Sequence, residues 1–264
     1  MNCAQHRNTV ITGSALKKYI GGYKMKYEIV GGAFPVAIFH LDSGESLVTE
    51  TGAMAWMSPD FELDVRGESF RRAMGRAITG ASLFRDVYTA LDDGLIALQP
   101  QNPGRIIELD ITPEKSIVLQ KSAFLASEPT VDLSVYLNDR ISTGIFGGEG
   151  FFLQKLSGEG KAFAAVYGEM VEYDLEEGQR MLVDTGNVLG FEDTVDMSIE
   201  SVPGLKNKLL SGRGFFNTVL TGPGKIMLQT LTPKHFKISG SSSSGGSAPS
   251  SEASSASTPA PSVE

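Results

Sequence analysis

Residues 111–135 read ITPEKSIVLQKSAFLASEPTVDLSV, and the same pattern occurs twice more without a gap, at residues 41–65 and 175–199. Each stretch opens with turn residues, continues with an apolar segment and a second turn, and closes with alternating apolar and polar residues. Alternation with a period of two is typical of a β-strand with one buried and one solvent-facing side. The three stretches therefore predict three copies of one strand-rich unit.

A second pattern follows each stretch at a matching distance. It runs apolar, any, glycine, any, small, apolar, phenylalanine, and it occurs at residues 78–84, 146–152 and 210–216. A turn and a further expected strand come next, at residues 94–98, 160–164 and 224–228. Since two patterns recur in phase, the sequence predicts tandem repeats at about 27–98, 99–168 and 169–238.

One such unit would leave open strand edges and half of a core. We therefore expect an all-β domain over residues 25–238, with the three units around a common pseudo-threefold axis in a barrel-like arrangement. Little helix is expected, because only residues 68–78 have tolerable helical spacing and Gly75 interrupts them. Residues 239–264 are rich in serine and lack aromatic residues, so this tail is predicted to be disordered.

The composition of the chain narrows the classes of function. A hydrophobic fraction of 41% in 264 residues is ordinary for a globular protein. The formal net charge is −8, and without the basic segment 1–24 and the tail it becomes −10, which disfavours binding to a phosphate backbone. Cys3 is the only cysteine, so no intrachain disulfide forms. No run of eighteen apolar residues predicts a membrane span.

Residues 1–24 carry four basic residues and no acidic one. This character weakly resembles an organelle transit peptide, but the interpretation we favour is that Met25 is the natural start and that an upstream extension precedes it. We expect a cytoplasmic location, with a mitochondrial one as the alternative for a eukaryotic source.

Six segments carry a resemblance to a known family. They are MKYEIVGGAFPV at 25–36, TGAMAWM at 51–57, LQKSAFLAS at 119–127, FGGEGFFLQKLSGEG at 146–160, VDTGNVLGF at 183–191 and TGPGKIMLQT at 221–230. Over residues 25–233 the chain resembles the altered-inheritance-of-mitochondria family, long catalogued as a domain of unknown function. In place of the glycine-rich run frequent in that family, this chain has RGESFRRAMGRA at 66–77.

The resemblance implies three tandem units similar to the subunit of the tryptophan RNA-binding attenuator protein. Bacterial and archaeal members are uncharacterised soluble proteins, and a eukaryotic relative is linked to the organisation of the mitochondrial inner membrane. No catalytic residues are established for the family, so none is assigned here by resemblance.

Two Asp-Ser/Thr-Gly triplets, Asp42-Ser43-Gly44 and Asp184-Thr185-Gly186, are of the kind that aspartic proteases use. A protease pair needs equivalent positions that face one another, whereas the repeat alignment places Asp42 opposite Glu176 and Asp184 opposite Glu50. Turn formation explains both triplets, because aspartate accepts local backbone hydrogen bonds and glycine permits positive φ. We therefore interpret them as turns.

Other motifs for chemistry have plainer interpretations. The glycine clusters at 147–150, 157–160 and 221–224 lack a Gly-Lys-Ser/Thr ending, and their recurrence favours hairpin turns over a phosphate cradle. The three histidines are too dispersed for a metal site, so no cofactor is predicted. The basic residues before Phe215-Phe216 have no counterpart before Phe151-Phe152, so core packing is favoured over RNA stacking.

Every recurring element is thus explained by architecture. We expect a non-enzymatic binding or scaffold protein that acts through its surface and self-associates. The alternatives are an enzyme or small-ligand binder with a pocket in one repeat, an RNA-binding protein by analogy of fold, and a mitochondrial membrane-organisation factor. Residues unique to one repeat, namely Trp56, Arg71 and Arg72, are the candidate surface or pocket residues.

Overall fold

A computed structural model describes residues 25–66, 85–136, 152–200 and 217–232. Nearly all of these residues lie in antiparallel strands or in the turns between them, which confirms the all-β class. Two 3-10 turns are the only helical elements of the described residues, and none of the described helices is long and apolar enough to cross a membrane. The helical stretch considered at 68–78 falls outside the described residues.

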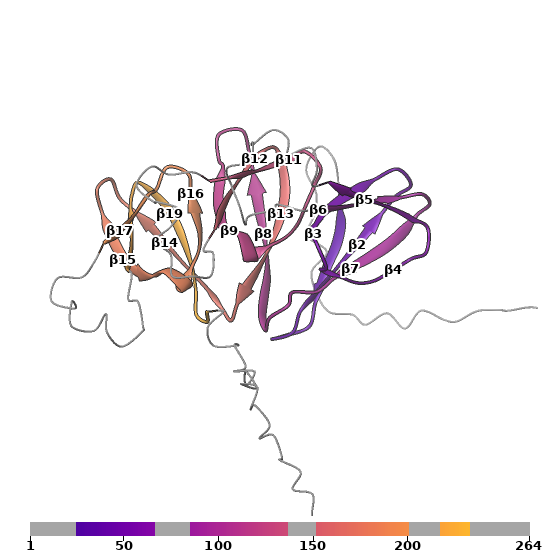
Figure 1. Cartoon of the computed structure of the whole chain (residues 1–264), viewed down its shortest axis with the longest axis horizontal. Coiled ribbons are helices and arrows are strands. Elements are labelled where there is room, and N and C mark those ends of the chain that lie inside the picture. The colour runs from indigo at the N-terminus through magenta and orange to yellow at the C-terminus, as the bar shows by residue number, and fades with distance from the viewer. Residues whose placement is uncertain (1–24, 67–84, 137–151, 201–216, 233–264) are drawn as a thin grey trace, which may run out of the picture.

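The strands divide into three successive units (Figure 1). The six strands β2 to β7 of the first unit recur in order as β8 to β13 and β14 to β19, whereas β1 has no counterpart among the described strands. The first unit contains β1 (Lys26–Val30), β2 (Val36–Leu41), β3 (Ser46–Glu50), β4 (Met54–Met57), β5 (Phe61–Arg66), β6 (Arg85–Ala90) and β7 (Gly94–Leu98). The second contains β8 (Gly104–Ile111), β9 (Ile117–Gln120), η2 (Lys121–Ala123), β10 (Phe124–Ser127), β11 (Val131–Val135), β12 (Leu153–Gly158) and β13 (Gly160–Tyr167). The third contains β14 (Met170–Leu175), β15 (Arg180–Asp184), η3 (Thr185–Asn187), β16 (Val188–Glu192), β17 (Asp196–Glu200), β18 (Asn217–Thr221) and β19 (Gly224–Gln229).

Four sheets connect these units. The strand orders are β1-β2-β7-β4, β5-β6-β3-β10-β13-β8, β11-β12-β9-β16-β19-β14 and β15-β18-β17. Each six-stranded sheet takes three strands from one unit and three from the next. The pairing that unites them is β3 with β10 at the first inter-unit joint, and β9 with β16 at the second.

The described strands form no closed barrel, and this differs from the barrel-like arrangement expected from the sequence. The three units lie in a row, with the second between the first and the third (Figure 1). The row stays open because of how the strands pair. The second unit pairs with the first through one edge and with the third through another, and no strand of the first unit pairs with a described strand of the third. The row therefore has two open ends. The repeat limits, the leader and the tail remain predictions.

A polar side chain closes the same corner in each unit. Ser58 Oγ accepts a hydrogen bond from the backbone N–H of Leu95 at 3.1 Å. In the second and third units, carboxylate oxygens of Glu128 and Glu192 accept from the N–H groups of Lys161 and Lys225, at 2.8 and 3.1 Å. These polar residues satisfy a partly buried backbone donor, which is a structural role.

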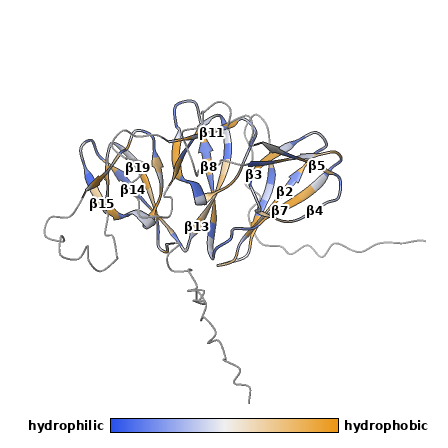
Figure 2. Cartoon of the chain, viewed as in Figure 1, coloured by the Kyte–Doolittle hydropathy of each residue, from blue (hydrophilic) through white to orange (hydrophobic). Residues whose placement is uncertain are grey.

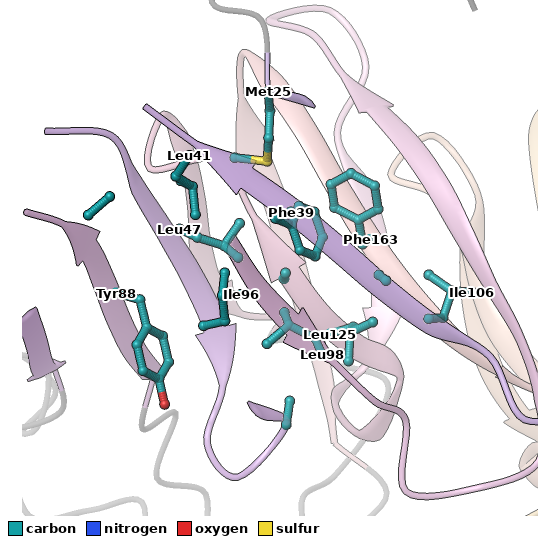
Figure 3. Packing of buried hydrophobic residues seen from close by; sticks show 14 residues of the cluster. Met25, Phe39, Leu41, Leu47, Tyr88, Ile96, Leu98, Ile106, Leu125 and Phe163 are labelled. Atoms are coloured by element: carbon teal, nitrogen blue, oxygen red, sulfur yellow. The ribbon is translucent and has the colours of Figure 1, made fainter. Parts of the chain in front are cut away.

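The cores extend across the joints. Figure 2 shows hydrophobic and hydrophilic residues on the strands of every unit, as the alternating pattern requires. Phe39 of the first unit packs edge-on against Phe163 of the second, with ring centroids 4.8 Å apart (Figure 3). Leu125 of the second unit joins the same cluster, and Leu189 of the third unit joins the core of the second. The cores of the first two units are therefore completed by the unit that follows.

Candidate functional site

The exposed side chains of β4 form the first candidate surface. Met54, Trp56 and Met57 expose 37%, 50% and 37% of their area. β4 forms because apolar residues follow the turn at Gly52. One edge of β4 pairs with β7. Its other edge has no partner among the described strands. We call Met54, Trp56 and Met57 the first end surface.

The corresponding strands in the other units are covered. All four residues of β10 are buried, as are the first four of β16, because each of these strands pairs with the unit before it. The same register shift interrupts the pairing of β4 with β7, of β10 with β13 and of β16 with β19, so β4, β10 and β16 are geometric equivalents. The first end surface is therefore an inter-unit contact that lacks its partner.

The chemistry of this surface suits apolar recognition. An indole offers a large rigid face with one N–H donor, and thioethers adapt to irregular neighbours. An unpaired strand edge adds backbone donors and acceptors that a partner strand can bind. The arrangement can bind a protein, but β4 itself carries no nucleophile, general base or metal ligand beside Trp56.

A hollow of about 360 Å³ lies at the opposite end of the row, in the third unit. Its walls come from β14, β15 and β19, and three of its apolar residues are strongly exposed. These are Val171 at 40%, Tyr173 at 46% and Leu182 at 58%. We call Val171, Tyr173 and Leu182 the second end surface. β15 is the edge strand of its sheet among the described strands.

A buried ion pair lies at the first inter-unit joint. Arg85 Nη1 is 2.7 Å from Glu50 Oε2, and Arg85 Nη2 donates to Gln154 Oε1 at 2.5 Å. The guanidinium also stacks on the ring of Phe124, 4.6 Å from its centroid. Burial raises the pKa of Glu50, although the charges of Arg85 and Lys121 oppose the shift. Burial likewise lowers the pKa of Arg85. Both members of the pair come from the first unit, and Arg85 connects them to Gln154 and Phe124 of the second, so the pair stabilises the joint.

A cavity of about 130 Å³ adjoins this pair. Glu50, Gln99 and Ser122 contribute polar groups to its wall, and Phe124 and Tyr167 contribute rings. Its volume is smaller than the roughly 300–1,000 Å³ of typical small-molecule sites.

A second group of titratable side chains lies on the surface between the first two units. Tyr27 donates a hydrogen bond to Glu108, and Lys161 donates to Glu108 and to Asp110. Burial and the hydrogen bond to Glu108 raise the pKa of the Tyr27 hydroxyl. Because the raised pKa keeps the Tyr27 hydroxyl protonated, Tyr27 is a poor general base. The group ties β1 to the second unit.

The sequence-predicted site residues are not brought together. Trp56 is on the first end surface, whereas Arg71 and Arg72 fall outside the described residues. Asp42 and Asp184 lie in different units. Asp184 ends β15, and its Oδ1 accepts from the N–H of Gly186, as expected for a turn. Asp42 precedes the turn at Ser43-Gly44, and its carboxylate pairs with the Lys26 side chain at 3.0 Å. No group of three or more metal-ligating side chains occurs in the described part of the chain.

Sequence reasoning missed the Glu50–Arg85 pair and the hollow. Arg85 gives a signal of its own, because the aligned positions in the second and third units hold the uncharged residues Leu153 and Asn217. A buried cation at such a position needs a partner. The hollow has no signal in the sequence, because it opens only where the row of described units ends.

Comparison with known proteins gives consistent matches. The family model for mitochondrial biogenesis AIM24 matches residues 27–231. An uncharacterised protein of Streptococcus pyogenes serotype M6 is 28% identical over 212 residues, which covers 77% of this chain and 84% of the relative. A crystal structure of a Streptococcus pyogenes protein superposes with a TM-score of 0.65 at 26% identity, and covers 81% of this chain and 96% of that chain.

Proposed function

This chain belongs to the mitochondrial biogenesis AIM24 family, as the resemblance in its sequence indicated, and we propose that it is a non-enzymatic scaffold that binds a protein partner through its first end surface. The observation that supports the proposal is the exposure of Met54, Trp56 and Met57, at positions whose equivalents in β10 and β16 are buried. An exposed apolar cluster on a strand edge is costly unless a partner covers it.

The relatives support a role that does not depend on mitochondria. The family description refers to mitochondrial biogenesis, but one relative and one similar structure come from Streptococcus pyogenes, a bacterium. We infer that the role common to both settings is carried by the protein itself, and our proposal for it in this chain is recognition through the first end surface. Our proposal for its location is the cytoplasm, a reducing compartment that suits a chain whose single cysteine forms no intrachain disulfide. For a eukaryotic source the proposal is the mitochondrion.

The test is native size fractionation of the full chain expressed in its own host. Wild-type protein is expected in an assembly larger than the monomer, and Trp56→Ser is expected to shift it to smaller size. The matched control is Leu91→Ser, because Leu91 is 60% exposed but lies in the turn between β6 and β7. Identical elution of wild type and Trp56→Ser contradicts the proposal.

The small-ligand alternative has one supporting feature, the polar cavity beside Glu50. Native mass spectrometry of protein from the host distinguishes it: a stoichiometric small molecule that is lost on Ser122→Phe, which fills the cavity, would favour a ligand site over the scaffold.

A further inference from the structure

The two joints inside the chain follow one rule. At the first, Ala126 of β10 pairs with Thr49 of β3. At the second, Gly190 of β16 pairs with Leu119 of β9, which is the same register in the repeat alignment. A strand of the β4 type thus adds, at both joints, to a strand of the β3 type in the unit before it.

Each end of the row carries one half of such a joint. β4 has no preceding unit to pair with, and β15, which corresponds to β3 and β9, has no following unit among the described strands. Both strands are sheet edges in this part of the chain, so their outward backbone groups are available for pairing.

The third unit lacks what a following unit supplies elsewhere. Tyr173 corresponds to Phe39 and Leu109, which expose 0% and 6% of their area, yet it is 46% exposed. Leu182 corresponds to Val118, which is fully buried, and is 58% exposed. The side chains that cover these positions in the first two units come from the next unit along the chain.

The hollow of the third unit has a covered counterpart in the first. Asp184 and Gln229 on its wall correspond to Glu50 and Gln99, which line the cavity of about 130 Å³. There Phe124, Leu125 and Tyr167 of the second unit close the opposite side. The hollow of about 360 Å³ is therefore the same space before a neighbouring unit covers it.

We propose that β4 of a second copy of this chain pairs antiparallel with β15 and that Trp56 of that copy fills the hollow. The inference rests on the proposed function and identifies the partner of the first end surface as the second end surface of another molecule. The register of the two internal joints places Trp56 opposite Val183 and Met57 opposite Leu182.

The residues of β4 suit a contact that differs from the internal joints in detail. β10 and β16 carry leucine followed by a small residue, Leu125-Ala126 and Leu189-Gly190, whereas β4 carries Ala55-Trp56. A Cβ added at Gly190 would lie 2.6 Å from Val118 O, so the second joint has no room for a large side chain there. The first joint holds Ala126 at the aligned position, opposite Thr49, so a joint of this register accommodates a Cβ there. The hollow of about 360 Å³ beside β15 offers space for a larger side chain.

The two surfaces that meet are different, so the contact is heterologous. Repetition of a heterologous contact closes into a ring or continues as a filament, and does not stop at a two-fold dimer. A row of three units per chain would then become a continuous row that crosses molecular boundaries.

Complementation between two blocked variants tests the proposal. Trp56→Asp keeps its β15 end and Leu182→Lys keeps its β4 end; both side chains are half or more exposed, so the fold tolerates the changes. In sedimentation of the purified full chain, wild type is expected to form assemblies that grow with concentration. Each variant alone is expected to stay monomeric up to about ten times the concentration at which wild type assembles. Their equimolar mixture is expected to give a 1:1 dimer and nothing larger.

A disulfide tests the register. In a Cys3→Ser background, Met57→Cys and Leu182→Cys on one chain are expected to link different copies on mild oxidation. Leu91→Cys in place of Met57→Cys is the control and is expected to give no link. Links between two copies of Met57→Cys alone would indicate a two-fold contact and overturn the proposal.

The outcomes separate this inference from the proposed function. A wild-type monomer at all concentrations, or a monomer that assembles only when residues 239–264 are deleted, overturns the inference. If Trp56→Ser still shifts the size of the assembly from host cells, the proposed function stands with another protein as partner. If it does not, both fail.

Discussion

Glu50 and Arg85 lie opposite each other on β3 and β6, and their side chains meet at 2.7 Å, whereas the same positions in the second unit hold Gln120 and Leu153. One joint of this molecule therefore contains an ion pair where the other contains a neutral, half-apolar pair. The comparison offers an internal control for the energetics of the buried charges.

Arg85→Leu is expected to destabilise the protein by about 2 kcal/mol, because it leaves the Glu50 carboxylate without its cation in a largely buried place. The double variant Glu50→Gln/Arg85→Leu copies the second joint and is expected to recover more than half of that loss. Urea denaturation measures both. A double variant less stable than Arg85→Leu alone contradicts this account of the pair.

Acid is expected to weaken the second joint through Glu192. Burial by itself raises the pKa of this carboxyl, but the N–H of Lys225 and the ammonium of Lys115, 3.0 Å away, outweigh it and lower the pKa below 4.5. The stabilisation is thus present above the unfolded pKa and is lost as pH falls through the folded one.

Lys115→Met is expected to reduce the free energy of unfolding by up to about 1 kcal/mol at pH 7, since Lys115 is half exposed. The difference from wild type should shrink as pH falls from about 5 to about 3, and high salt at pH 7 should also reduce it. Thermal unfolding across this pH range is the measurement. A difference that grows in acid would show that Lys115 acts through another group.

Gly190→Ala is expected to cost about 1–3 kcal/mol, because the added methyl group meets Val118 O of the neighbouring strand at 2.6 Å. Gly32→Ala is the matched control: a methyl group added there has no atom within 4 Å and the φ of Gly32 is not left-handed, so stability should hold or rise slightly. Chemical denaturation compares the two. Equal effects would mean that the second joint is looser than its geometry indicates.

Phe163→Ala is expected to destabilise the first unit although the residue belongs to the second, because its ring lies edge-on to Phe39. The loss should be about 3–5 kcal/mol, as for other buried phenylalanines. Hydrogen exchange should show faster exchange in β2 and β7 together with β13. Phe34→Ala, at a residue that is 74% exposed, should leave exchange in these strands unchanged. Protected β2 amides in Phe163→Ala would contradict a shared core.

Several elements of the fold could be predicted from local sequence. The strand expected at residues 94–98 is β7 with the same limits, and those expected at 160–164 and 224–228 are the first parts of β13 and β19. Glycine at the start of each and the apolar residues after it leave few other conformations. The turn role of Asp184 was predictable for the same reason, since the hydrogen bond it accepts lies two residues away.

The candidate surfaces were only half predictable. Trp56 was singled out because it occurs in one repeat, but its exposure depends on β4 being first in the row. Leu182 and Tyr173 carry no local mark, since their equivalents Val118 and Leu109 are equally apolar and are buried.

The amino-acid sequence by itself determined local elements such as β7, the first parts of β13 and β19 and the turn at Asp184, because these depend on neighbours within a few residues. Only the tertiary structure decided that the units form an open row with sheet edges at β4 and β15 among the described strands. Strands pair through backbone groups that nearly all residues share, so the sequence of one strand does not name its partner. Which edges are covered depends on where each unit lies in the row.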